Sequence, residues 1–100
     1  MRLKKRYPKV TSDLIKAFED IEANPLVGVV IPEDYSIRKL RVASRDMQRG
    51  KSGGFRLLYK LRSHENEFTI AVLLYLYAKV DQSDVSVEFL ATLDDDISES

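Results

Sequence analysis

Basic side chains gather in the middle of this sequence, and their spacing predicts a site for phosphate groups. The window from Arg38 to Lys60 contains eight bases and one acid, Asp46. Arg56 stands inside a predicted strand, where a guanidinium is costly unless it faces an open surface or a partner. A guanidinium binds two phosphate oxygens at once and stays charged. Lys39 and Arg41 are two residues apart, so we expect them to share one face of the preceding strand.

Further polar residues extend this candidate site into a loop and onto a third strand. Tyr77 and Lys79 end the third predicted strand, where Tyr77 could stack on a base or transfer a proton. Lys51 lies in a loop whose glycines would let the backbone turn tightly and approach a ligand. These glycines are Gly50, Gly53 and Gly54.

Each of these residues also has a structural interpretation. Arg56 could form an ion pair with the acidic C-terminal half of the chain. Lys39 and Arg41 could protect an exposed edge strand by their charge. Lys51 could lie in a flexible hairpin loop, and Tyr77 could pack in the core with its hydroxyl satisfied. The residues alone leave these alternatives open.

One helix and three strands are predicted to position the site. Apolar residues recur at three- and four-residue spacing from Lys9 to Ala23, with Thr11, Ser12 or Asp13 as the cap, which predicts a helix. The apolar segment Leu26 to Ile31 predicts a helical turn or a short packing segment. Strands are predicted at Ile37–Ala43, Phe55–Leu61 and Phe68–Ala78, and Ser83 or Asp84 could cap a short helix through Val87 and Leu90.

These elements predict an α+β fold, with an N-terminal helix packed on a three-stranded antiparallel sheet and a short C-terminal helix. Short turns between the strands favour an antiparallel meander. The helix would cover one sheet face and leave the other partly open. We expect residues 1–93 to form a single domain and residues 94–100 to form an acidic, frayed tail.

Composition narrows the classes of function. The net charge of zero conceals fourteen bases against seven acids in residues 1–60, and two against nine in residues 61–100. This division is typical of a polyanion-binding side, of two halves that attract each other, or of a solvated surface with an acidic tail. The absence of cysteine excludes disulfides and a thiolate nucleophile. The longest apolar run, Ile70 to Ala78, is too short to cross a membrane, and the basic start lacks the apolar core of a signal peptide. The cytoplasm is therefore the expected location.

Three segments in the same order and spacing resemble the RelE/HigB toxins of bacterial type II toxin–antitoxin pairs, in the RelE/ParE superfamily. The first combines Asn24-Pro25-Leu26-Val27-Gly28 with Ile37-Arg38-Lys39-Leu40-Arg41, the second is Gly50 to Tyr59, and the third is Leu74 to Lys79 with Asp81, Ser83 and Asp84. The similarity covers roughly residues 5–90. Other members have a short strand and a longer first helix before the stretch Lys4-Lys5-Arg6-Tyr7-Pro8. The chain is thus expected to be N-terminally shortened and to lack one edge strand, and such an edge could pair with another chain.

The resemblance implies a ribosome-dependent messenger RNA endonuclease that uses no metal and no cofactor. Arg56 would bind the phosphate, Lys39 and Arg41 would lie at the scissile phosphate, and Lys51, Tyr77 and Lys79 would complete the catalytic set. The implied partners are a cognate antitoxin, messenger RNA on the ribosome, and operator DNA only through the antitoxin. A membrane is not expected, and a homodimer is left open.

Two other functions fit the same resemblance. Val80 and Ser86 stand where RelE-type members have Arg and Tyr, which favours a catalytically degenerate module that binds an antitoxin peptide. A ParE-like gyrase inhibitor is the remaining alternative, and the intact set of Lys39, Arg41 and Arg56 argues mildly against it.

Overall fold

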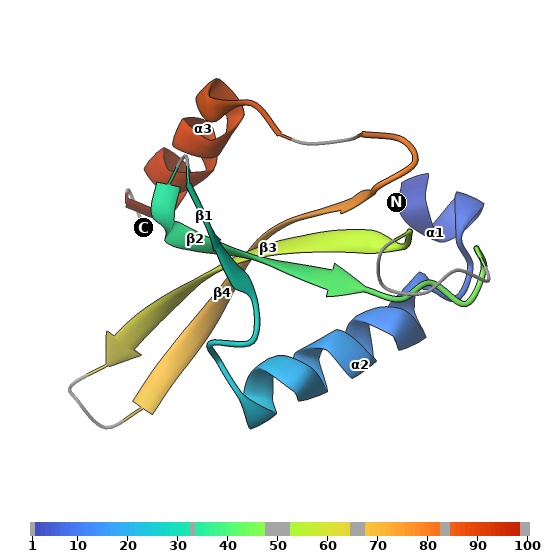
Figure 1. The fold of residues 1–100 in the computed structure, drawn as a ribbon, viewed down its shortest axis with the longest axis horizontal. Helices are drawn as coiled ribbons and strands as arrows, with labels where there is room; N and C mark the ends of the chain where they lie inside the picture. The colour runs from blue at the N-terminus through green and yellow to red at the C-terminus, as the bar shows by residue number, and fades with distance from the viewer. Residues whose placement is uncertain (1, 33, 48–52, 65–67, 83–84, 99–100) are drawn as a thin grey trace.

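A computed structural model describes residues 2–32, 34–47, 53–64, 68–82 and 85–98. In this part of the chain, three helices accompany one four-stranded sheet (Figure 1). The elements in chain order are α1 (Arg2–Arg6), α2 (Val10–Ala23), β1 (Val29–Ile31), β2 (Asp34–Val42), β3 (Phe55–His64), β4 (Phe68–Ala78) and α3 (Val87–Ser98).

The sheet is antiparallel throughout, with the strand order β1-β2-β3-β4. The predicted α+β class and the antiparallel meander of the three longer strands are therefore confirmed. The pairing of β2 with β3 begins at Val42 opposite Phe55, and that of β3 with β4 extends to His64 opposite Phe68. Strand β3 is thus longer than predicted, because residues 62–64 also pair with β4.

The predicted number of strands was wrong, because the sheet has four strands and not three. Val29 and Val30, within the segment predicted as a helical turn or packing segment, pair with Lys39 and Arg38 of β2. β-branched side chains favour this extended conformation. A strand of three residues is too short to show the alternation by which strands are recognised. Helix α1 was not predicted either.

Each face of the sheet carries its own apolar core, and the two larger helices lie on opposite sides of it (Figure 1). Helix α2 packs Val10, Ala17 and Ile21 against side chains that include Leu57 and Tyr59. Helix α3 places its buried residue Leu90 in the second core, on the opposite face, with Ile37, Leu58 and Tyr77. The second face, predicted to be partly open, is thus covered in part by α3.

Helix α2 begins and ends close to its predicted limits, but its capping differs from the prediction. Thr11, Ser12 and Asp13 lie inside the helix, and Lys9 occupies the cap position without a side-chain cap bond. The backbone N–H of Lys9 instead donates to the carboxylate of Asp46 at 2.8 Å. The helix ends at Ala23, just before Asn24-Pro25, where the residue preceding proline disfavours helical dihedral angles.

Helix α3 is capped by Ser86, whose hydroxyl accepts a hydrogen bond from the backbone N–H of Phe89 at 3.1 Å. The predicted caps, Ser83 and Asp84, lie outside the described residues. The helix extends to Ser98 and so includes the acidic stretch that was assigned to a frayed tail. None of the helices in the described ranges has the length and apolarity needed to cross a membrane.

Tyr59 fastens the segment before β1 to the sheet, and its hydroxyl provides the first testable prediction. The buried hydroxyl donates to the carbonyl of Pro25 and accepts from the N–H of Gly28, both at 2.8 Å. Tyr59→Phe leaves both backbone groups without this partner, so we expect a loss of about 1–3 kcal/mol of unfolding free energy in urea denaturation. Tyr75→Phe is the matched control, because its hydroxyl meets Gln82 in a half-buried place. An equal loss in both variants would contradict the account.

Candidate nucleic-acid interface

Three strands align Arg41, Arg56 and Tyr77 in one row across the sheet. Arg41 of β2 lies directly opposite Arg56 of β3, and Arg56 lies directly opposite Tyr77 of β4. Lys39 precedes Arg41 by two residues and is opposite Leu58, so it lies on the same face. The sheet therefore brings four of the six predicted site residues together on the face that α3 partly covers.

Exposure to solvent falls steeply along this row. Arg41 is exposed and Lys39 is half-buried, whereas Arg56 is only 5% exposed and Tyr77 only 3%. The guanidinium of Arg56 donates from Nη1 to the carbonyl of Phe55 at 3.1 Å. The row thus joins a solvent-facing cation to an enclosed one, and a ligand arriving from solvent would meet Arg41 first.

Arg56 is held in an environment that opposes its charge. Burial lowers the pKa of the Arg56 guanidinium, and the positive charge of Arg41 lowers that pKa further, while Tyr77 raises it. Like charges placed directly opposite each other destabilise a strand pair. An anion between the two guanidinium groups would remove this repulsion and could accept charge-assisted hydrogen bonds from both. The pair therefore has the chemistry of a phosphate site.

Aromatic side chains enclose Tyr77 under helix α3. Its ring stacks on Tyr75 with centroids 5.8 Å apart, and Tyr75 meets Phe89 of α3 edge-on at 4.7 Å. The Tyr77 hydroxyl is also buried. In this arrangement the Tyr77 ring packs against protein rather than presenting a free surface to a base. Its predicted role in stacking or proton transfer stays a prediction.

Only part of the loop before β3 lies within the described residues and can be compared with the predicted site. Lys51 and Gly50 lie outside the described residues, so their predicted roles are untested. Gly54 does allow a close approach, but to the protein's own backbone: a Cβ there would lie 2.2 Å from the carbonyl oxygen of Val42. The exposed Lys79 follows β4, and its backbone N–H donates to the Gly54 carbonyl at 3.0 Å.

Two acidic residues that were not predicted as part of the site hold the loop after β2. Asp13 of α2 is 5% exposed and accepts a hydrogen bond from the backbone N–H of Arg45 at 3.2 Å. Asp46 binds the start of α2 through the N–H of Lys9. Because this loop begins just after β2, two residues beyond Arg41, both carboxylates help to fix the end of the strand. Asp46 could have been singled out from the sequence, because it is the single acid between Arg38 and Lys60.

No protein-family model matches this chain. No solved structure matches it significantly. Within the described residues, no group of three or more histidine or acidic side chains is placed to hold a metal ion. The functional assignment therefore depends on the residues of the row and on their geometry.

Proposed function

We propose that this chain is the toxin of a bacterial toxin–antitoxin pair of the RelE/HigB type, and that it cleaves messenger RNA on the ribosome. The observation that carries the proposal is the pairing of Arg41 with Arg56 in register, one exposed and one buried. Two guanidinium groups in register can both donate charge-assisted hydrogen bonds to the oxygens of one phosphate. Fixed cations aimed at developing negative charge are a main source of catalytic power.

The proposed reaction needs only the message and the side chains of this face. The 2′-hydroxyl of a ribose attacks the adjacent phosphorus, a 2′,3′-cyclic phosphate forms, and the bond to the 5′-oxygen of the next nucleotide breaks. Arg41 and Arg56 stabilise the charge that accumulates on the phosphate oxygens. Lys39 and Tyr77 lie on the same face and carry groups that can transfer protons. One of the two groups takes the proton from the attacking hydroxyl, and the other gives a proton to the leaving oxygen.

The burial of Arg56 determines the order of contacts. A message phosphate binds first at Arg41 and Lys39, which solvent reaches. Contact with Arg56 then requires the side chains around it to separate, because only 5% of that residue is exposed. The proposed site of action is the cytoplasm, where ribosomes translate, and the proposed protein partner is an antitoxin encoded by a neighbouring reading frame.

The same burial favours a second candidate function. With Arg56 and Tyr77 enclosed, the face could bind RNA phosphates or an acidic antitoxin peptide through Arg41 and Lys39 without cleaving anything. This non-catalytic module predicts a stable complex and intact messages. The two functions are separated by incubating the purified chain with translating ribosomes and mapping the ends of the message.

Arg41→Ala tests the exposed half of the pair. Losing hydrogen bonds to a charged group costs about 1.5–3 kcal/mol, so we expect message cleavage to slow about ten- to hundredfold. Arg62→Ala is the control, because Arg62 is also exposed but lies six residues beyond Arg56 on β3, about 20 Å away. Cleavage that is unaffected by Arg41→Ala, or affected equally by both changes, would refute the role of the pair. DNA-damage signalling with intact messages would indicate gyrase inhibition instead.

A further inference from the structure

Strand β4 forms an outer edge of the sheet and has an unusual composition for that position. Among the described residues it is hydrogen-bonded to β3 alone. Its eleven residues, FTIAVLLYLYA, include no charged residue and no proline. Natural edge strands are usually short or carry charges, prolines or bulges that prevent pairing with another strand. β4 has a single register irregularity, opposite Leu58 and Tyr59, and is otherwise regular.

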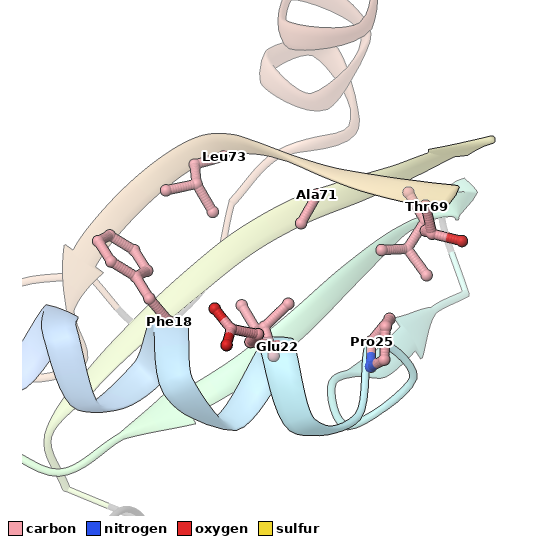
Figure 2. Close-up of a pocket in the computed structure, with 8 residues that line it drawn as sticks. Phe18, Glu22, Pro25, Thr69, Ala71 and Leu73 are labelled. Carbon is pink, nitrogen blue, oxygen red and sulfur yellow. The ribbon is translucent and has the colours of Figure 1, made fainter. Parts of the chain in front are cut away.

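Apolar side chains are exposed on both faces of this edge strand. Leu73 is 45% exposed on the α2 face, and Ile70 is 42% exposed on the opposite face. On the α2 face, a groove of about 310 Å³ lies between α2 and β4. Figure 2 shows Phe18 and Glu22 on one side of this groove and Ala71 and Leu73 on the other. A backbone edge flanked by apolar groups on both faces fits another β-strand better than a helix.

The lack of charge along β4 favours a second copy of this chain as the partner of this edge. A two-fold axis perpendicular to the sheet would set β4 antiparallel to β4 of the second copy. Each side chain of the strand would then lie opposite a neutral side chain. The whole chain also has a formal net charge of zero, so long-range repulsion between two copies is small. The same axis keeps the α2 face on one side of the joined sheet. The Leu73 side chain and the groove of one copy would therefore adjoin those of the other copy.

We propose that two copies of this chain pair through β4 in antiparallel register and form one continuous sheet. The pairing satisfies the outer backbone groups of both strands and shields Leu73 and Ile70 from water. It leaves Arg41 and Arg56 on the interior strands of each copy, and the side chain of Tyr77, although on β4, is already buried within its own copy. The dimer thus stands independently of the proposed function, and either can fail without the other.

Sedimentation velocity of the full chain over a wide range of concentrations tests this pairing. We expect the wild-type mass to approach that of a dimer with rising concentration. Leu73→Lys places two like charges at the joint and should weaken the dimer at least about tenfold. Val29→Lys is the matched control, because Val29 is 73% exposed on β1, the opposite edge of the sheet. Thermal unfolding verifies that both variants are folded.

Hydrogen exchange gives the second measurement, since backbone amides at the outer edge of β4 should exchange more slowly as the dimer forms. A wild-type chain that stays monomeric at its highest soluble concentration would overturn the proposal, and so would a monomer that binds only foreign extended peptides along β4. A dimer that is insensitive to Leu73→Lys, or one that Val29→Lys weakens equally, would also overturn it.

Discussion

Arg56→Met is expected to slow message cleavage on the ribosome by about 10²- to 10³-fold, the usual cost of removing one preorganised donor to a developing oxyanion. Arg56 is the enclosed member of the arginine pair and stands in register between Arg41 and Tyr77. Methionine fills a similar volume, so the change removes the guanidinium while keeping the apolar packing. It removes a like charge from beside Arg41 and also the hydrogen bond to the Phe55 carbonyl. These two effects oppose each other, so we expect only a small net change in thermal stability.

This combination of effects distinguishes a functional arginine from a structural one. If Arg56 serves mainly in a stabilising ion pair, Arg56→Met should lower the melting temperature and reduce cleavage only as far as unfolding does. Arg56→Lys keeps the charge without the planar fork and should recover part of the rate. Arg62→Met, the same change further along β3, should cleave like the wild type. A stable Arg56→Met variant with full activity would contradict the proposed site.

Gly54→Ala is expected to cause the largest loss of stability, about 3 kcal/mol or more out of the 5–15 kcal/mol that typically holds a domain folded. The added Cβ would lie 2.2 Å from the carbonyl oxygen of Val42 and 3.0 Å from the backbone nitrogen of Ser44. Both atoms belong to the backbone, so no side-chain rotation relieves the overlap. The clash also lies where β2 begins to pair with β3, at Val42 opposite Phe55.

Gly28→Ala provides the comparison for this measurement. The Cβ at Gly28 would lie 2.7 Å from Cε1 of the Tyr59 ring, which is a side chain that can shift a little. We therefore expect a smaller loss there, measured by urea denaturation of both variants. A Gly54→Ala chain that melts within a few degrees of the wild type would show that the close approach of the two backbones is not required.

Local patterns predicted the parts of the fold that depend on neighbouring residues. The three- and four-residue spacing of apolar side chains predicted α2, and the alternation along β2 predicted that Lys39 and Arg41 share one face. Strand β1 was missed because three residues show no period. The backbone freedom of Gly54 could be predicted from the sequence. Its close neighbour, the backbone of Val42, is known only once β2 and β3 are paired.

The burial of the site could not be predicted, because it arises from contacts between distant parts of the chain. Whether Tyr77 faces solvent depends on where α3 packs, and that position follows from Leu90 joining the core of Ile37, Leu58 and Tyr77. The register that sets Arg41 against Arg56 depends in turn on the loop between β2 and β3. Asp13 was considered only as a helix cap, although its carboxylate binds the backbone of Arg45.

The salt dependence of binding to single-stranded RNA tests the central claim most directly. Each phosphate contact to a single strand contributes about 0.7 to the slope of log affinity against log salt concentration. If Arg41 and Lys39 bind phosphates, Arg41→Ala and Lys39→Ala should each reduce the slope by about that amount. Lys16→Ala, on the solvent side of α2, should leave it unchanged. Equal slopes for the wild type and all three variants would contradict a phosphate site on this face.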